Sequence, residues 1–454
     1  MMARETVTAI ILAAGKGTRM KSRLPKVLHK IAGRPMLGHV ISSVHEIPNA
    51  RSVLVVGPDM DEVATYAKSL APDTGIAVQT EQLGTAHAAL MAQPEISDRE
   101  GVVLVIFGDT PLMHPETLAA MANNCREEAD IVVLGFRPAD PAAYGRLVLD
   151  EVGTLQKIVE FKDASATERA ITLCNGGAMA VRAEYLFDLL SKVGNDNAAG
   201  EYYLPDIVGL AREKDLTCRV QEGEEEEVQG VNSRADLAAA EAVMQRRLRQ
   251  AAMAGGATLA DPDSTYFSFD TVLGQDVTVG QNVVFGPGVN VADGATIKPF
   301  SHLEGATVAA NAEVGPFARI RPGSSIGAGA KIGNFVETKK AEIEEGAKVS
   351  HLSYIGDARV GAHANIGAGT ITCNYDGYNK FFTDIGAGAF VGSNSALVAP
   401  VKIGDGAYLG SGSVITKDVT PDALAFTRPK QIEKSGWAST FRAKNESPDK
   451  KTKD

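Results

Sequence analysis

The first 231 residues alternate short apolar runs with longer segments whose apolar residues recur at helical spacing. Short runs rich in valine and isoleucine are typical of buried strands. The pattern predicts strands at 7–12, 52–56 and 102–107, and helices at 36–46, 60–71, 84–93 and 115–126. This alternation indicates an α/β fold with a doubly wound, mostly parallel sheet. Ligands bind beyond the carboxyl ends of such strands, so the loops that follow them are the first candidates for chemistry.

A different rhythm governs the second half, where an apolar residue recurs every six positions. This period fits neither a helix nor the two-residue alternation of a plain strand. It is typical of a parallel β-helix of hexapeptides, in which each apolar residue points to the axis before the chain turns a corner, and roughly eight coils are expected over 272–420. The inward positions are Leu273, Val279, Phe285, Val291, Ile297, Leu303, Val308, Val314, Ile320, Ile326, Ile332, Ile343, Val349, Ile355, Ile385, Val391, Leu397, Ile403, Leu409 and Ile415.

The two patterns meet at a long stretch rich in alanine, arginine and leucine. It starts at the N-cap candidate Ser233 and ends before Gly255-Gly256, so we expect a connecting helix there. The predicted parts are an α/β domain at 1–232, the helix at 233–254, a β-helix at 255–446 and a charged, disordered tail at 447–454.

Composition narrows the class of protein. An apolar share of 44% with 22% charged residues is typical of a globular chain, and of the 46 glycines 27 follow position 254, where the corners of the β-helix are expected. The net charge of −11 argues against a broad nucleic-acid surface. No apolar run approaches the ~18 residues of a membrane span. The four cysteines lie far apart without a C-x-x-C motif, so we expect neither a zinc knuckle nor disulfides, and a cytoplasmic location.

The segment after the first strand has the composition of an anion site. It reads LAAGKGTRM, followed by LPK, and its glycines Gly15 and Gly17 let backbone N–H groups approach a phosphate. Lys16, Arg19 and Lys26 add positive charge. The segment is neither a Walker loop nor a dinucleotide fingerprint. The alternative is a tight turn with solvated basic residues.

Two further loops carry candidate chemistry in this half. Asp109 stands at the end of the third long strand, where it suits Mg²⁺ binding or, equally well, the capping of the next helix. The amides of 79–85 suit recognition of a base edge, although a polar turn before a helix is the favoured reading of that segment.

The six-residue rhythm breaks between Ile366 and Ile385, where the insertion GAGTITCNYDG is expected to leave the prism as a loop. Just before it, His351 stands two positions after the inward Val349. A histidine base near neutral pKa suits the removal of a proton from an attacking amine. The alternative is a surface or stacking histidine.

In the first half, the motifs LAAGKGTRM with LPK, EQLGTAHA, FGDTPL, YGRLV, IVEFKDA, CNGG and GVNSRADL resemble the nucleoside-diphosphate-sugar pyrophosphorylases. Their order is similar to that in the bacterial bifunctional N-acetylglucosamine-1-phosphate uridyltransferases. The resemblance implies catalytic roles for Arg19 and Lys26, uracil selection by Gln79, Gly84 and Thr85, and Mg²⁺ binding by Asp109 and Asn232. It implies that UTP and UDP-N-acetylglucosamine contact Leu12, Ala13, Ala14, Gly15, Lys26, Gln79, Gly84, Thr85, Phe107, Gly108, Asp109, Gly145, Glu160, Asn175 and Asn232, with the amino sugar at Gly145, Glu160 and Asn175.

The second half resembles the left-handed β-helix acyltransferases, which assemble as homotrimers with sites between subunits. The motifs RIRPG, NFVETKK, HLSYIGDA and NIGAGTITCNYDG are similar to the glucosamine-1-phosphate acetyltransferase half of the same bifunctional family. The resemblance implies that His351 deprotonates the amine that attacks acetyl-CoA. It places the sugar phosphate at Arg321, Lys339, Tyr354 and Asn365, and acetyl-CoA along Ala368, Asn374, Tyr375, Ser393, Ser411 and Arg428. The left hand of the β-helix is implied by this resemblance alone.

The resemblance implies one chain with two activities: acetyl transfer from acetyl-CoA to glucosamine-1-phosphate, then Mg²⁺-dependent uridylyl transfer from UTP. The product, UDP-N-acetylglucosamine, supplies peptidoglycan and lipopolysaccharide synthesis. The expected partners are these small molecules and further copies of the chain, with no nucleic acid and no membrane. One alternative is a single-activity sugar-1-phosphate nucleotidyltransferase whose β-helix is structural or regulatory. Another is a scaffolding solenoid with a degenerate enzyme half.

Overall fold

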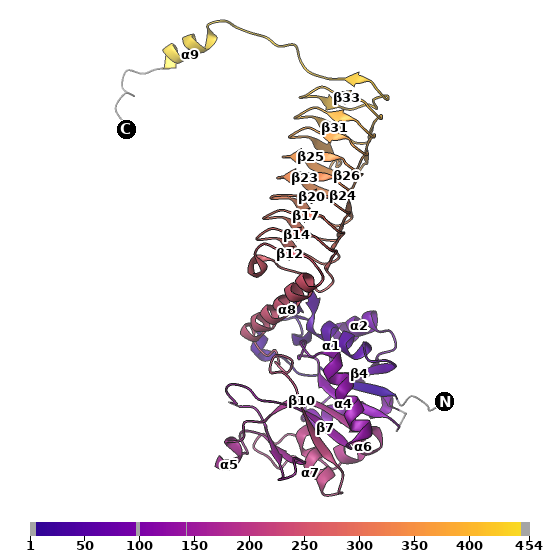
Figure 1. Ribbon diagram of the computed structural model, residues 1–454, viewed down its shortest axis with the longest axis vertical. Coiled ribbons are helices and arrows are strands. Elements are labelled where there is room, and N and C mark those ends of the chain that lie inside the picture. Colours follow the sequence, from indigo (N-terminus) through magenta and orange to yellow (C-terminus); the bar gives the residue numbers. More distant parts are fainter. Residues whose placement is uncertain (1–5, 97–99, 142, 446–454) are drawn as a thin grey trace. The chain divides into compact units, whose positions relative to one another are not determined.

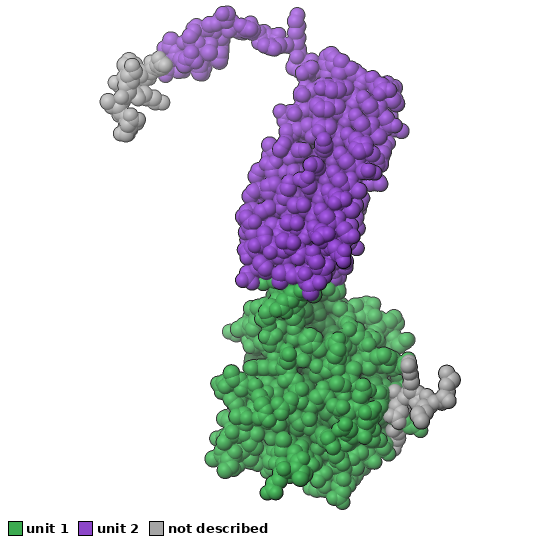
Figure 2. Space-filling view, in the orientation of Figure 1, with its two compact units in different colours: residues 1–251, 267–269 green, residues 252–266, 270–454 purple. Residues whose placement is uncertain are grey.

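The computed structural model describes residues 6–96, 100–141 and 143–445. The chain divides into two compact units (Figure 2). The α/β unit comprises Met1–Ala251 with Phe267–Phe269, and the β-helix unit comprises Ala252–Tyr266 with Asp270–Asp454. The tail expected at 447–454 lies outside the described residues. Among the helices that the structure describes, none is long and apolar enough to cross a membrane.

The α/β unit is built on a mixed sheet with the strand order β11-β7-β10-β6-β1-β4-β5. Strands β6, β1, β4 and β5 are parallel, as are β11 and β7, whereas β10 is antiparallel to both neighbours. A hairpin of β8 and β9 extends from β10. The bounds are β1 Val7–Leu12, β4 Ala50–Val56, β5 Gly75–Val78, β6 Val102–Phe107, β7 Ile131–Phe136, β8 Arg146–Leu149, β9 Leu155–Val159, β10 Cys174–Arg182 and β11 Cys218–Glu222; β2 Lys30–Ile31 and β3 Arg34–Pro35 form a separate small pair.

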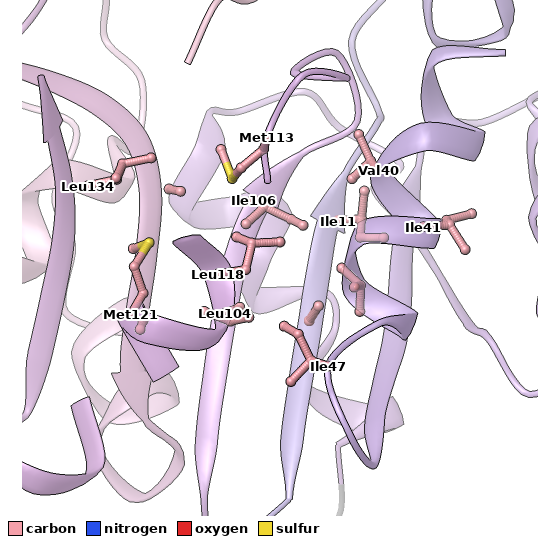
Figure 3. Close-up of a cluster of buried hydrophobic side chains, with 14 of the residues drawn as sticks. Ile11, Val40, Ile41, Ile47, Leu104, Ile106, Met113, Leu118, Met121 and Leu134 are labelled. Carbon is pink, nitrogen blue, oxygen red and sulfur yellow. The ribbon is translucent and has the colours of Figure 1, made fainter. Parts of the chain in front are cut away.

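Helices cover both faces of this sheet. On one face, Ile11 of β1 and Leu104 of β6 pack with Val40 and Leu118 from helices α1 and α4 (Figure 3). The intervening strand residues, Ile10 among them, pack with α3, α6 and α7 on the other face. This alternation produces the doubly wound α/β fold that the apolar pattern predicts. The helices are α1 Met36–His45, α2 Asp61–Leu70, α3 Thr85–Leu90, α4 Pro115–Glu127, α5 Ala166–Arg169, α6 Ala183–Leu190, α7 Ile207–Arg212 and α8 Arg234–Ala254.

The predicted strands are confirmed, and 7–12 and 102–107 match β1 and β6 end to end. The helix predicted at 84–93 is shorter than expected. It ends at Leu90, and a 3-10 turn at Gln93–Glu95 follows. Proline stands inside that turn and cannot supply the backbone N–H that a continuing α-helix needs.

The β-helix unit stacks coils whose strands form three parallel rows (Figure 1). The first row is β12 Thr258–Leu259, β14 Thr278–Val279, β17 Thr296–Ile297, β20 Glu313–Val314, β23 Lys331–Asn334, β25 Lys348–His351, β27 Asn365–Ile366, β30 Phe390–Val391, β33 Tyr408–Leu409 and β35 Leu424–Ala425. The second row is β15 Val284–Phe285, β18 His302–Leu303, β21 Arg319–Ile320, the starts of β24 Glu337–Ile343 and β26 Tyr354–Val360, then β28 Ile371–Cys373, β31 Ala396–Val398 and β34 Val414–Ile415. The third row is β13 Val272–Leu273, β16 Asn290–Val291, β19 Ala306–Val308, β22 Ser324–Ile326, the ends of β24 and β26, β29 Thr383–Ile385 and β32 Val401–Ile403. Helix α9, Trp437–Asn445, follows the last strand.

The six-residue repeat correctly predicts which residues point into the prism. Each predicted inward residue except the half-buried Leu273 is at most 3% exposed. The roughly eight coils expected over 272–420 are confirmed, because the first row has eight strands there, from β14 to β33, and the prism continues beyond this range with β12 and β35. The spacing does not predict these two end strands, because their inward residues, Leu259 and Ala425, do not continue the six-residue repeat.

The expected insertion is smaller than predicted. Gly367–Cys373 does not leave the prism, because β28 pairs with β26 below it and β31 above it. The residues that leave are 374–382, where Tyr375 and Lys380 form an isolated antiparallel bridge. Asp376 fixes the tip by accepting hydrogen bonds from the N–H groups of Tyr378 (2.8 Å) and Asn379 (2.6 Å).

Candidate active sites

The loop after β1 bends tightly against Lys26. Gly17 has a left-handed backbone (φ +60°), and a Cβ atom there would lie 2.7 Å from the Cβ of Lys26. A side chain at this position would strain the turn and displace the lysine. A Cβ added to Gly15 would meet nothing within 4 Å. Gly17 therefore serves the turn, whereas Gly15 leaves space for a ligand.

The Lys26 ammonium lies between two oxygen-bearing side chains. It forms an ion pair with Asp109, which follows β6, and donates a hydrogen bond to Asn232 Oδ1 (3.1 Å). The Lys26 and Asp109 side chains are 13% and 19% exposed, so solvent screens their attraction less than at an open surface. Because the oxygens of Asp109 and Asn232 converge on one cationic group, they suit a hard divalent cation.

Asn232 is placed by the start of helix α8. Ser233 and Asp236 form a capping box: Ser233 N–H donates to the Asp236 carboxylate (2.8 Å), and Asp236 N–H donates to Ser233 Oγ (3.2 Å). The same carboxylate accepts from Asn232 N–H (3.0 Å), and Val231 N–H donates to the Asp109 carbonyl (2.9 Å). Burial raises the pKa of Asp236, but these hydrogen bonds outweigh it, so the net pKa lies below the usual range. The helix cap thus holds Asn232 beside Asp109.

A cavity of about 280 Å³ opens over the ends of β1 and β6. Ten of the predicted nucleotide residues line it: Leu12, Ala13, Ala14, Gly15, Lys26, Gln79, Gly84, Thr85, Phe107 and Asp109. The Gln79 amide nitrogen hydrogen-bonds the Gly84 carbonyl (3.0 Å) and lies 3.1 Å from His87 Nδ1. With that nitrogen engaged inside the protein, the amide oxygen is the group left to meet a base edge.

A second cavity of about 380 Å³ adjoins the first, since Thr85, Phe107 and Glu201 line both. The predicted sugar residues Glu160 and Asn175 lie in this second cavity. Gly145 does not line it but sits against Glu160 and hydrogen-bonds through its carbonyl to Asn175 N–H (2.9 Å). Burial, and then the neighbouring Asp163 and Asp206, raise the pKa of Glu160.

The remaining predictions for this unit lie outside the cavities. Arg19 is exposed in the 3-10 turn Thr18–Met20 that follows Gly17, close enough to Asp236 to lower the pKa of that carboxyl. Gly108 packs against Ala13 and Val27 behind the cavity wall. Asn232 reaches the cavity through its contact with Lys26.

His351 stands on the edge of the prism where the first row turns into the second. We call this the first edge; its successive corners include Asn334, His351, Ala368, Ser393 and Ser411. The corners stack through backbone hydrogen bonds, for example Asn394 N–H to the Ala368 carbonyl (2.7 Å) and Gly412 N–H to the Ser393 carbonyl (2.7 Å). The His351 ring is exposed, and its Nδ1 lies 2.6 Å from Asn334 Oδ1 one coil below. Arg428 lies over Gly410 and Gly412 at the end of this edge.

Other predicted acetyltransferase residues lie on a second edge, between the second and third rows. Arg321 and Lys339 occupy successive corners there, and Arg321 pairs with Glu337 (2.7 Å). The nearby ammonium of Lys380, from the 374–382 loop, lowers the pKa of Lys339, and Arg321 adds to this effect. Tyr354 projects from the second row toward this edge, over Gly356. These residues form a cluster of positive charge suited to a phosphate.

Three predicted residues fall elsewhere in this arrangement. Asn365 lies in β27 of the first row, away from the Lys339 corner. Asn374 and Tyr375 belong to the loop at the second edge, where Asn374 donates a hydrogen bond to Asp357 and the Tyr375 hydroxyl donates one to the Gly377 carbonyl. In a single chain the residues predicted for acetyl-CoA are therefore divided between the two edges.

Comparison with known proteins identifies both parts. A MobA-like NTP transferase domain matches residues 9–169, and a bacterial transferase hexapeptide model of six repeats matches residues 382–417. A "Bifunctional protein GlmU" of Parvibaculum lavamentivorans is 68% identical over 96% of this chain and 96% of its own length. Proteins of the same name are 62% identical in Rhodospirillum rubrum and 55% identical in Paramagnetospirillum magneticum, each covering at least 96% of both chains. The chain belongs to the bifunctional GlmU family.

Membership of the GlmU family establishes the class of reaction. The protein is a bifunctional transferase, a glucosamine-1-phosphate acetyltransferase and an N-acetylglucosamine-1-phosphate uridyltransferase, which together make UDP-N-acetylglucosamine for cell-wall synthesis. Its β-helix is the left-handed one of hexapeptide-repeat transferases, and its nucleotidyltransferase half works with a divalent metal. Among solved structures, the chain is similar to a UDP-glucose pyrophosphorylase complexed with UDP-glucose, with TM-score 0.44 and 16% identity over 53% of this chain and 98% of that one.

Several residues at these sites were missed by sequence reasoning. Glu201 lines the nucleotide cavity, as does Gln82, which belongs to the 79–85 segment but received no individual role and donates a hydrogen bond to the Ala14 carbonyl. Lys380 joins the cationic corner, and Asn334 contacts His351. A spacing of one coil from His351 was the available signal for Asn334, whereas nothing in the local pattern distinguishes Glu201.

Proposed function

We propose that uridylyl transfer takes place in the two adjoining cavities of the α/β unit, and acetyl transfer on the edges of the β-helix unit around His351. The observation that carries the first assignment is the meeting of the two cavities at Phe107, with Lys26 and Asp109 in the lining of the nucleotide cavity and Asn232 hydrogen-bonded to Lys26. A nucleotide in one cavity and a sugar phosphate in the other would bring their reacting phosphates together near that cluster.

In uridylyl transfer, a phosphate oxygen of N-acetylglucosamine-1-phosphate attacks the α-phosphorus of UTP. A new P–O bond forms, the bond to the β-phosphate breaks, and pyrophosphate leaves with its electron pair. The attacking oxygen is already ionised, so no general base is needed. The task is to align two anions and stabilise the charge that develops on the α-phosphate. Lys26 and Arg19 supply that charge, while Gln79, Gly84 and Thr85 hold the base and Glu160 and Asn175 the sugar.

Asp109 and Asn232 are the residues we propose to hold Mg²⁺, which supplies charge neutralisation between the phosphates. Among the described residues, no group of three or more His, Cys, Asp or Glu side chains could hold a metal. One carboxylate and one amide oxygen leave most of the octahedral shell to phosphates and water, as Mg²⁺ prefers. We therefore expect the metal to bind tightly only together with the nucleotide.

In acetyl transfer, the amine of glucosamine-1-phosphate attacks the thioester carbonyl of acetyl-CoA. His351 takes the proton that the nitrogen loses, the C–S bond breaks, and the proton passes to the departing thiolate. Arg321, Lys339 and Lys380 would bind the sugar phosphate, while the first edge from Ala368 to Arg428 would hold acetyl-CoA. Histidine suits this step because its imidazole changes charge near neutral pH.

The division of these residues between two edges supports an oligomer. A prism cannot bring two of its own edges together, but the first edge of one copy can face the second edge of another. Repeating such a heterologous contact around an axis closes a ring, and we propose the homotrimer. Four free cysteines support a reducing cytoplasm as the location.

The experiment is a cross of two variants against two assays. We expect Asp109→Ala to abolish pyrophosphate release from UTP and leave acetyl transfer intact, and His351→Ala to do the reverse. Asp73→Ala and His363→Ala, both at exposed positions, serve as matched controls. Loss of both activities from either variant would contradict independent sites. Intact acetyl transfer in His351→Ala would favour the alternative in which the β-helix is only structural.

A further inference from the structure

The coil below His351 places an amide against its ring. Asn334 ends β23 and His351 ends β25, and the two are directly paired in the parallel ladder. Their side chains meet with 2.6 Å between Asn334 Oδ1 and His351 Nδ1. Among the described residues, Asn334 is the hydrogen-bond partner of this ring.

The backbone on both sides of this contact is held in place. The His351 carbonyl accepts from Ser353 Oγ (2.8 Å) and from Gly369 N–H (3.3 Å), and the Asn334 carbonyl accepts from Leu352 N–H (3.0 Å). Gly333 cannot carry a side chain, since a Cβ would lie 1.9 Å from the Ser350 carbonyl oxygen. The coils therefore stack with the two side chains in a fixed register.

The chemistry of the contact determines the state of the imidazole. An amide oxygen can only accept a hydrogen bond, so it favours the tautomer with the proton on Nδ1. The lone pair of the neutral ring then lies on Nε2, on the side away from Asn334. A general base must carry its lone pair on the nitrogen that faces the substrate. In an exposed imidazole without a partner, neither the tautomer nor the orientation of the ring is fixed.

We propose that Asn334 is a positioning residue for acetyl transfer: it fixes the His351 tautomer and aims Nε2 at the substrate amine. This inference rests on the proposed role of His351 as the base. Asn334 does not touch the reacting atoms and acts only through the imidazole.

Charged and titratable groups on the neighbouring elements do not duplicate this role. Lys331 lies on β23 and Lys348 on β25, and both are exposed and three residues before the contact. Glu337, at the start of β24, is paired with Arg321 (2.7 Å). Tyr354, at the start of β26, lies over Gly356. A change of charge at position 334 should therefore act on His351 directly.

The test is the pH profile of kcat for acetyl transfer in Asn334→Ala and Asn334→Asp. Loss of one hydrogen bond should lower kcat of the alanine variant about tenfold. Aspartate still accepts from Nδ1 but carries charge that favours the imidazolium, so it should restore most of kcat at high pH and shift the acidic limb upward by about one pH unit. Asn290→Asp, at an exposed strand position several coils away, adds the same charge and should leave the limb unchanged.

The outcomes separate the inference from the function beneath it. An unchanged kcat in Asn334→Ala would overturn the inference, and so would a lower kcat with an unmoved acidic limb in Asn334→Asp, which would indicate a purely structural effect. Thermal unfolding of each variant identifies misfolding. If the aspartate variant does not fold, Asn334→Ser replaces it: its hydroxyl is too short to reach the ring, so its kcat must match that of the alanine variant. Full acetyl transfer in His351→Ala would instead overturn the proposed function.

Discussion

The two units assemble their sites in opposite ways. In the α/β unit, residues at the ends of β1 and β6 line one cavity, and Asn232, just before α8, contacts the cavity residue Lys26 across 206 positions of sequence. In the β-helix unit, residues one coil apart stand above one another on open edges, as Asn334 and His351 do. The sheet gathers distant segments at one end, whereas the prism spreads its residues along edges, where the proposed homotrimer would complete them with another copy.

The largest expected effect comes from removing Lys26, the cation that lies between Asp109 and Asn232 in the α/β unit. Lys26→Ala should lower uridylyl transfer about 10²–10³-fold, the usual cost of losing one preorganised group that stabilises transition-state charge. It also leaves Asp109 without its ionic partner. Acetyl transfer should be unchanged, and Lys68→Ala, at an exposed position of α2, should affect neither. The rate of pyrophosphate release measures the loss. A decrease of less than tenfold would show that Lys26 does not take part in the reaction.

The open site should respond more gently to loss of one cation. Lys380→Ala should raise the KM for glucosamine-1-phosphate about tenfold, the equivalent of one charge-assisted hydrogen bond, because Arg321 and Lys339 remain. It should also raise the pKa of Lys339, since the Lys380 ammonium is the main cause of its depression. Lys402→Ala, 67% exposed on β32, is the control. An unchanged KM would place the phosphate elsewhere.

The stability of the fold should distinguish Gly15 from Gly17 in the loop after β1. Gly17→Ala forces an alanine into a left-handed backbone and against Lys26, at a cost of about 1–2 kcal/mol. The melting temperature of the α/β unit should fall by about 2–8 °C. Gly15→Ala meets open space and should melt like the wild type. Equal melting curves for both variants would show that the Gly17 turn relaxes without cost.

The smallest effect concerns Glu160, whose pKa is raised by burial. A raised carboxyl pKa means that the folded state penalises the ionised form, so above that pKa the ionised group destabilises the fold. Glu160→Gln should therefore raise the melting temperature at pH 7 by about 1–2 °C. The difference from the wild type should shrink as the pH falls through the pKa of Glu160. A difference in melting temperature that stays constant with pH would show that the effect comes from packing and not from the charge of Glu160.

Local pattern predicted much of both folds. Apolar runs gave β1 and β6 their correct ends because a buried parallel strand must be apolar on both faces. The six-residue rhythm placed Val279 and Ile403 on the prism axis because each coil repeats the same three turns. It failed at Gly367–Cys373, since a change of rhythm does not show whether the chain leaves the prism or continues through one more strand.

The sequence by itself determined the family, the two kinds of unit and most residues around the nucleotide cavity, because these are carried by contiguous motifs and short periods. Only the tertiary structure decided that Glu201 lines both cavities, that the cap of α8 brings Asn232 to Lys26, and that the side chains of Asn334 and His351 meet. The first two contacts join residues that no local spacing relates, whereas Asn334 and His351 lie one coil apart. All three exist because packing fixes which strand ends and which coils become neighbours.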